Sequence, residues 1–204
     1  MRVLVGCEYS GVVRDAFTAR GHSAASCDIL PTESPGEHYQ CDVLQVINQE
    51  HWDLAIFHPP CTHLAVSGAR YFKDKQVQQV EALEFVRQLL AAPVEMIALE
   101  NPISIISSKI RKPDQIIQPW MFGHDAQKAT CLWLKGLPKL VSTQYVPPSK
   151  LCSNGKWRYA NQSPCGANNL GPSPTRAHER SRTYSGIAAA MACQWGCMMP
   201  ESEM

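Results

Sequence analysis

Short apolar segments alternate with helix-like segments along the first half of this 204-residue chain, and this alternation constrains its fold more than any other feature. The strand-like runs are Val3–Val5, Ser23–Cys27, Trp52–Phe57 and Met96–Leu99. The segments Val12–Arg20 and Lys75–Leu90 have helical character, and Gly21 ends the first of them. Strands separated by helices predict an α/β fold with a mostly parallel sheet flanked by helices.

The second half of the chain is less regular. Thr130–Leu134 has the composition of a strand, and Gly186–Gln194 has that of a helix. A chain of this length supplies one globular core. We therefore predict a core over 1–145, a small loop-rich insertion over 146–175, and a C-terminal part, 176–204, that returns to the core.

Composition narrows the setting in which the protein works. The longest apolar stretches are far shorter than the roughly 20 residues of a membrane span, and Met1-Arg2 leads directly into a strand without a cleavage site. The nine cysteines are scattered and odd in number, which favours reduced thiols over a disulfide scaffold. We expect a soluble cytoplasmic protein that does not bind membranes.

Basic residues gather late in the chain. The net charge is only +1, but the segment Thr143–Thr183 carries six Lys or Arg residues against one Glu. Such a segment is either a surface for a polyanion or a solvated basic loop. Trp157 and Tyr159 within it either stack on bases or fill the core of the insertion. A zinc site from Cys152, Cys165, Cys193 and Cys197 lacks the usual Cys-x-x-Cys spacing, so we predict no metal.

Polar and glycine residues follow the predicted strands, where the carboxyl ends of a parallel sheet form a binding edge. The turn Glu8-Tyr9-Ser10-Gly11, after Gly6, is expected to let a ligand approach the backbone and to present the next helix's N-terminus. Asp28 and Asp42 are placed to accept hydrogen bonds from a ribose diol and an adenine amino group. Both are equally explained as turn-formers.

Two further strand ends carry groups suited to covalent chemistry. Cys61 follows a rigid Pro-Pro turn, a place that suits a nucleophile better than an inert core thiol. Glu100 ends an apolar strand, where a carboxyl group needs a partner or a role. A protonated Glu100 could donate to a ring nitrogen; the alternative is a carboxylate paired with backbone or arginine groups.

Together these two groups suit methylation of carbon 5 of cytosine. That carbon is a poor nucleophile, and addition of a thiolate to carbon 6 activates it. Proton donation to ring nitrogen 3 offsets the charge that develops during the addition. We therefore assign the thiolate to Cys61 and the donated proton to Glu100.

The motifs, in this order, resemble those of the cytosine-5 DNA methyltransferases along nearly the whole chain. His58-Pro59-Pro60-Cys61 resembles the family's nucleophile loop, and Glu100-Asn101-Pro102 resembles its Glu-Asn-Val loop, with Pro102 in place of Val. The resemblance implies a Rossmann-like fold, S-adenosyl-L-methionine as cofactor, and Cys61 as the covalent catalyst, with Glu100 and Asn101 beside it.

The same resemblance assigns further residues. Gln127–Cys131 matches a Gln-x-Arg-x-Arg strand that contacts the target base, but Ala129 and Cys131 replace the arginines, which leaves Lys128 or Thr130 for that role. Glu179–Arg182 resembles a Glu-x-x-Arg element, and Gly186–Ala192 resembles the closing helix. By position, the cofactor would be held by Gly6, Glu8, Tyr9, Ser10, Gly11, Asp28, Ile29, Asp42, Val43 and Pro59.

The insertion is very short for a target-recognition region, so the implied DNA partner has alternatives in single-stranded DNA and RNA. A cytosine in a duplex would have to be flipped into the site. The small size favours an origin in a phage or another mobile element. Two other functions stay open: a nucleic-acid-binding relative that no longer turns over, and an enzyme that places a different group on carbon 5. The sequence specifies neither the target sequence nor the oligomeric state.

Overall fold

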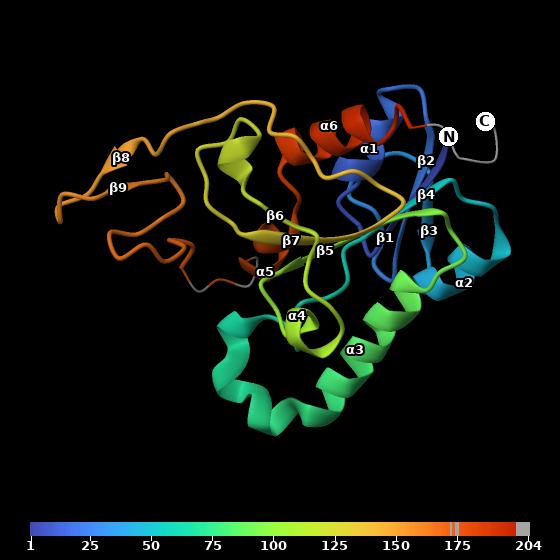
Figure 1. The fold of residues 1–204 in the computed structure, drawn as a ribbon, viewed down its shortest axis with the longest axis horizontal. Coiled ribbons are helices and arrows are strands. Elements are labelled where there is room, and N and C mark those ends of the chain that lie inside the picture. Colours follow the sequence, from blue (N-terminus) through green and yellow to red (C-terminus); the bar gives the residue numbers. More distant parts are fainter. Residues whose placement is uncertain (172, 174–175, 199–204) are drawn as a thin grey trace.

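A seven-stranded sheet crosses the computed structural model, which describes residues 1–171, 173 and 176–198. The strand order is β3-β2-β1-β4-β5-β7-β6 (Figure 1). The strands are β1 (Arg2–Gly6), β2 (Ser23–Asp28), β3 (His38–Gln40), β4 (Leu54–Phe57), β5 (Met96–Pro102), β6 (Gln115–Ile117) and β7 (Thr130–Lys135). The first five are parallel, and β7 is antiparallel to both of its neighbours. The predicted α/β class is confirmed.

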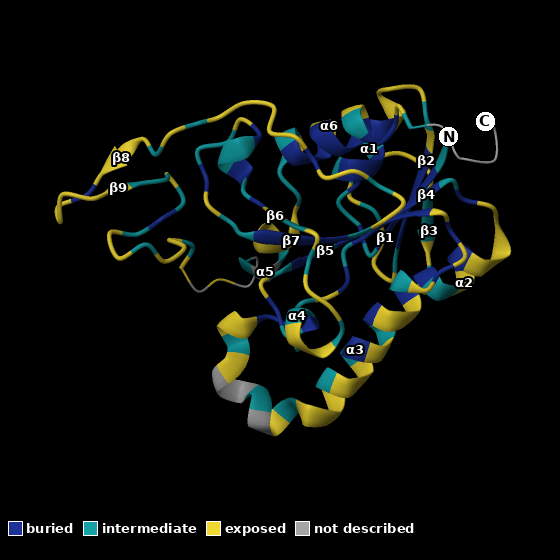
Figure 2. Cartoon of the chain, viewed as in Figure 1, coloured by how far each residue is buried: buried dark blue, intermediate teal, exposed yellow. Residues whose placement is uncertain are grey.

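Helices cover both faces of the sheet (Figure 1). They are α1 (Val12–Thr18), α2 (Val43–Gln49), α3 (Gln76–Leu90), α4 (Ile106–Lys109), α5 (Arg176–Ser181) and α6 (Ser185–Gln194), with 3₁₀ turns η1 (Val66–Lys75) and η2 (Pro119–Met121). On one face α1 and α6 pack around Phe17 and Trp195. On the other, α2, α3 and α4 pack around Trp52 and Trp133. Figure 2 shows the central strands buried between these layers.

Successive residues of the central strands point to opposite layers, as the pleat requires. Val3 and Val5 of β1 join the α1–α6 core, whereas Leu4 joins the α2–α3 core. In β4, Leu54 and Ile56 face the first layer, and Ala55 and Phe57 face the second. A strand buried on both faces has no polar side, which explains why these segments are continuous apolar runs in the sequence.

The helix α3 packs against the sheet over only part of its length. Leu83, Val86 and Leu89 are buried, but Val77 is 68% exposed and Val80 is 66% exposed. The first turns of α3 extend beyond the sheet together with η1 (Figure 1), so their apolar positions have no layer to pack against.

The insertion contains the hairpin of β8 (Lys150–Leu151) and β9 (Trp157–Arg158), which forms a separate two-stranded sheet (Figure 1). Asn161 ties the insertion to the core, because its side chain accepts from the Gln127 amide and donates to the Gln127 carbonyl, each at 2.9 Å. The ring of Tyr159 stacks on Trp120. Residues 172, 174, 175 and 199–204 lie outside the described residues, and the domain boundaries stay predictions.

The described part of the chain holds neither a helix suited to a membrane nor a cluster of side chains suited to a metal ion. None of its helices combines the length and apolar character needed to cross a membrane. Over the same residues, no three His, Cys, Asp or Glu side chains lie close enough together to hold a metal ion, and these residues include Cys152, Cys165, Cys193 and Cys197.

Candidate active site

A cavity of about 110 Å³ lies at the carboxyl ends of β1, β4 and β5. It brings together eight of the residues that the sequence predicts for the site: Glu8, Tyr9, Ser10, Pro59, Cys61, Glu100, Asn101 and Lys128. Thr130 lines a smaller neighbouring cavity, which it shares with Glu100 and Lys128. The other predicted residues do not line the main cavity: Gly6, Gly11, Asp28, Ile29, Asp42 and Val43.

The turn that carries Cys61 is fixed to the end of β5. The side-chain amide of buried Asn101 donates to the Pro59 carbonyl at 2.9 Å. The Cys61 carbonyl accepts from the backbone amides of Leu64 and Ala65 at 3.0 and 2.9 Å, which closes the turn after the cysteine. The proline pair cannot continue the β4 ladder, so the chain leaves the sheet here and places Cys61 over its edge.

Cys61 is a thiol in the resting protein. Burial raises its pKa above the usual value, and the negative charge of Glu100 adds to this effect, while Lys128 and Arg180 oppose it. A half-buried thiol of this kind is a weak nucleophile until its proton is removed.

Glu100 lies beside His58, with 3.1 Å between the carboxylate Oε2 and the imidazole Nδ1. The two side chains are only 12% and 9% exposed. Burial by itself raises the pKa of Glu100, but the hydrogen bond to His58 and the charge of Lys128 outweigh it and hold the pKa below its usual value. The expectation of a protonated Glu100 is therefore wrong for the resting protein, because the second interpretation, a paired carboxylate, applies with His58 as the partner.

Lys128 reaches this site because β7 runs antiparallel to β5 and pairs Thr130 with Pro102. Its ammonium group donates to the carbonyls of Arg180 and Arg182 at 2.8 and 3.3 Å. Lys128 therefore joins β7 to the segment after α5 while it lowers the pKa of Glu100. Thr130 is buried, and its hydroxyl also stabilises the Glu100 carboxylate.

The turn after β1 differs from its prediction. The carboxylate of Glu8 is buried and accepts from the Val13 and Arg14 amides at 2.8 and 3.2 Å, so the first amides of α1 are already satisfied and are not presented to a ligand. Gly6 is required by packing, because an added Cβ would lie 2.6 Å from the Val43 side chain. Ser10 donates to Glu8 from within the same turn.

Asp28 and Asp42 act as turn-formers. Each accepts from the backbone amide two residues later, Leu30 and Leu44, at 2.9 Å, and Asp42 thereby caps α2. Cys7 directly follows β1, and its pKa is raised first by burial and then by the negative charges of Asp28 and Asp42. Both carboxylates therefore also lie near the end of β1. Their neighbours differ: Val43 is buried, whereas Ile29 is 75% exposed.

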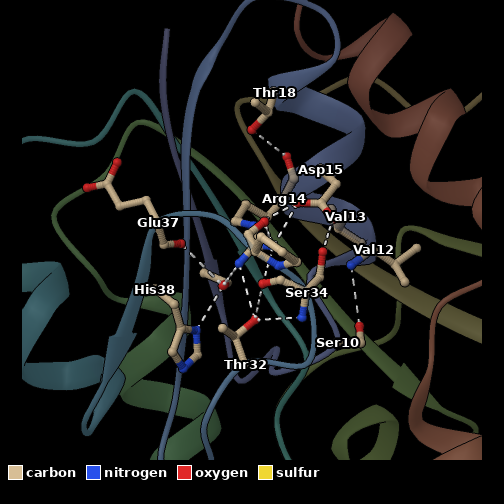
Figure 3. A network of polar contacts seen from close by, with 12 residues as sticks. Ser10, Val12, Val13, Arg14, Asp15, Thr18, Thr32, Ser34, Glu37 and His38 are labelled. Carbon is tan, nitrogen blue, oxygen red and sulfur yellow. Dashed lines mark hydrogen bonds and ion pairs between the residues drawn. The ribbon is translucent and has the colours of Figure 1, made fainter.

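Arg14 fixes the loop that follows Asp28 (Figure 3). Its buried guanidinium donates to the Ser26 hydroxyl at 3.0 Å and to the Ser34 and Pro35 carbonyls at 3.1 and 3.0 Å. The hypothetical Cβ of Gly11 would collide with the same group, and Gly11 has a φ of 74°, which favours glycine. This glycine thus serves internal packing.

The loop in turn holds the α5 segment over the cavity. Glu33 pairs with His178 at 2.7 Å and with Arg182 at 2.5 Å. The hydroxyls of Tyr9 and Ser181 are hydrogen-bonded at 3.0 Å, and the Tyr9 ring contacts the His178 ring edge-on. The segment Arg180–Thr183, which lines the cavity, is therefore held in place by both Glu33 and Tyr9.

No family model matches this sequence. Nor does any curated protein. A solved structure does match: a protein from an Escherichia coli prophage, provisionally described as a DNA modification methyltransferase, is 16% identical with a TM-score of 0.50, and the match covers 73% of this chain. The chain spans about half of that protein, 53% of its length. The fold is a Rossmann-like methyltransferase fold. This confirms the predicted fold class.

The sequence predicted no role for several residues that line the cavity. Cys7 and His58 line the cavity, as do Arg180 and Thr183. Cys7 has a φ of 59°, which is uncommon outside glycine and reflects the tight exit from β1. His58 directly follows β4, so the strand-end rule that selected Cys61 could also have selected it.

Proposed function

We propose that the protein is an S-adenosyl-L-methionine-dependent methyltransferase that modifies carbon 5 of cytosine in DNA through a covalent Cys61 adduct. One observation carries the proposal: Cys61 and Glu100 line the same cavity, from the ends of two adjacent strands. A thiol and a carboxyl group in one cavity are the two groups that addition to a pyrimidine ring requires.

The cysteine and the carboxyl group divide the chemistry. Cys61, once deprotonated, adds to carbon 6 of the cytosine. Glu100 provides the proton that ring nitrogen 3 takes up as negative charge develops there. Carbon 5, activated in this way, would take up the methyl group that the bound cofactor supplies. Loss of the carbon 5 proton to water and cleavage of the bond between sulfur and carbon 6 then release Cys61. Since Asn101 holds the Pro59 carbonyl, it keeps the nucleophile at a fixed place relative to Glu100.

The residues around the cavity fit a nucleoside cofactor. Asp28 and Asp42 offer carboxylate oxygens near the end of β1, and exposed Ile29, the neighbour of Asp28, offers an apolar surface. Asn101 has a buried carbonyl oxygen, Oδ1, for which the described part of the chain offers no hydrogen-bond partner, and a ligand group in the cavity would satisfy it. The cofactor would supply the methyl group when bound, and Tyr9, Ser10 and Pro59 line the cavity that would receive it.

Nucleic acid as the substrate is supported by the charges around the cavity and on the insertion. Arg180 and Arg182 line the cavity. The hairpin carries Lys150, Arg158 and a 57% exposed Trp157. Phosphate contacts by such residues make binding strongly dependent on salt, and the target cytosine has to leave its stack to reach Cys61.

The test is transfer of labelled methyl from S-adenosyl-L-methionine to double-stranded DNA, single-stranded DNA and RNA, followed by mass spectrometry of the nucleosides. We expect 5-methylcytosine in DNA, and its loss in Cys61→Ser but not in Cys193→Ser, which changes an exposed cysteine. Methyl groups on adenine, or on the exocyclic nitrogen of cytosine, would contradict the proposal.

The remaining outcomes separate the other functions. If 5-methylcytosine forms in RNA alone, the substrate is RNA and not DNA, and the proposed mechanism is kept. If no polymer is labelled although the protein binds nucleic acid, the chain is a binding relative without turnover. If labelled methyl is absent but carbon 5 carries another group, the protein transfers that group instead.

A further inference from the structure

His58 is a buried imidazole at the end of β4 whose role the mechanism above does not explain. Its Nδ1 lies 3.1 Å from the Glu100 carboxylate, and its Nε2 is buried without a hydrogen-bond partner among the described residues. Its backbone is fixed as well, because the His58 amide donates to the Gly6 carbonyl at 2.9 Å. Among the described residues, Glu100 is thus the hydrogen-bond partner of the imidazole ring.

The resting state of Glu100 conflicts with its task. Glu100 has to give a proton to the cytosine ring, yet its pKa is held low, so that it carries no proton near neutral pH. Lys128 cannot correct this, since its ammonium group stabilises the carboxylate and is itself bound to the Arg180 carbonyl. The proton must therefore reach Glu100 from a neighbour within hydrogen-bond distance, and the imidazole of His58 lies 3.1 Å from its carboxylate. Histidine is the side chain that proteins commonly use to transfer protons.

We propose that His58 is a positioning residue for Glu100 that shares one proton with it and supplies the proton that Glu100 passes to nitrogen 3 of the flipped cytosine. This inference rests on the proposed cytosine-5 methyl transfer and extends it. The active form of the pair is neutral overall, either imidazolium with carboxylate or imidazole with carboxylic acid.

Each proton and each electron pair that moves in this step has a donor and an acceptor. Cys61 first loses its thiol proton to water, and the thiolate pair then forms the bond to carbon 6. The displaced ring electrons move toward nitrogen 3, which takes the proton from Glu100, while the Nδ1 proton of His58 moves onto Glu100. When the sulfur–carbon bond breaks, nitrogen 3 returns its proton to Glu100 and the original pair is restored.

Other charged and titratable groups face the pair and shape its titration. Lys128 and Thr130, from the start of β7, favour the Glu100 carboxylate. Cys61 faces it from the nucleophile turn, and Arg180 approaches Cys61 from the α5 segment. Cys131 lies behind it on β7, where burial and then the Glu100 charge raise its pKa to about 11.

The deciding variant is His58→Asn. The asparagine amide can still donate a hydrogen bond to Glu100 from the place of Nδ1, but it cannot act as an acid or base and transfer a proton. We expect kcat for methyl transfer to fall by roughly 100-fold, within the range for lost acid–base catalysis, while KM for DNA and for the cofactor changes little. The deficit should grow with rising pH, since Glu100 then has to take its proton from water. Activity close to that of the wild type would overturn the proposal.

A double-mutant cycle separates this role from a general structural one. In a Glu100→Gln background, which has no proton to pass on, His58→Asn should cause almost no additional loss. If His58→Asn costs the same factor in both backgrounds, it acts independently of Glu100 and the proposal fails.

A measurement without turnover keeps this inference distinct from the proposed function. The carboxyl carbon of Glu100 is followed by NMR in protein labelled at glutamate, across the acid range. We expect the midpoint of its titration to move upward in His58→Phe and to stay lower in His58→Asn, which retains the hydrogen bond. An unchanged midpoint in His58→Phe overturns the His58–Glu100 pair. A shifted midpoint in a protein that methylates no cytosine would instead refute the proposed function.

Discussion

The two halves of the sheet's carboxyl edge are built in different ways. At the ends of β4, β5 and β7, side chains bond to partners far away in sequence, as His58 does with Glu100 and Lys128 with the Arg180 carbonyl. At the ends of β2 and β3, Asp28 and Asp42 bond to backbone amides only two residues later. The first half is a cavity fixed by tertiary contacts, whereas the second is a pair of local turns beside it.

This difference suggests separate roles for the halves. Fixed geometry suits bond-making, because a small displacement of a catalytic group is costly. Local turns suit the binding of a nucleoside, since each carboxylate can use a second oxygen for a ligand. Changes in the first half should therefore affect turnover, and changes in the second should affect cofactor affinity or stability.

Removal of the nucleophile should have the largest effect. Cys61→Ser should lower the rate of methyl transfer by on the order of 10³-fold or more, because the covalent step is lost. The rate is measured with labelled cofactor on DNA. Cys193→Ser, at an exposed site on α6, is the control and should keep the rate. A Cys61→Ser enzyme with a tenth of the normal rate would show that this half does not carry the covalent chemistry.

Removal of the buried arginine should cause the largest loss of stability. Arg14→Met removes the hydrogen bonds from the guanidinium to the Ser34 and Pro35 carbonyls and to the Ser26 hydroxyl. We expect the free energy of unfolding in urea to fall by roughly 2–3 kcal/mol. Arg20→Met, at an exposed position after α1, should change it by less than about 0.5 kcal/mol. Equal losses in the two variants would mean that Arg14 does not stabilise the loop.

A conservative change at Asp28 isolates the cofactor half. Asp28→Asn keeps an oxygen for the Leu30 amide but removes the negative charge that a ribose diol would bond to. We expect KM for the cofactor to rise roughly tenfold, equivalent to about 1.4 kcal/mol, with kcat unchanged. Glu81→Gln, on the exposed side of α3, is the matched loss of charge. A fall in kcat at constant KM would move Asp28 into the catalytic half.

The smallest effect concerns the pH dependence of Cys61. Its pKa is raised by burial and then by Glu100, so the thiolate fraction increases only as pH rises above the usual range of a thiol. Glu100→Gln removes the second cause and should lower this pKa. We therefore expect a few-fold faster alkylation of Cys61 by iodoacetamide at mildly alkaline pH, followed by mass spectrometry of the Cys61 peptide. Slower alkylation would contradict the sign of the Glu100 effect.

The sequence predicts the centre of the fold better than its edges. The apolar runs that became β1, β4 and β5 are buried on both faces, so their composition alone marks them. The three-residue strands β3 and β6 lack such a run and are not predictable in this way. Val77 and Val80 follow a helical period but lie where α3 has no sheet beneath it.

The candidate site shows the same limit. Cys61 and Glu100 are detectable because each is a chemically reactive side chain close behind an apolar run. His58 occupies an equally informative position, but its role depends on a contact across 42 residues that no local pattern reveals. The helix start after Gly11 also misled prediction, because only the structure shows that Glu8 occupies the amides of α1.

Covalent trapping tests the central claim most directly. DNA that contains 5-fluorocytosine at the target base is incubated with the protein and S-adenosyl-L-methionine, and the products are analysed by denaturing mass spectrometry. The account predicts a stable protein–DNA adduct that carries one methyl group on a Cys61 peptide, because fluorine blocks the final elimination. DNA methylated at carbon 5 by a protein that forms no adduct, or forms it at another residue, would contradict it.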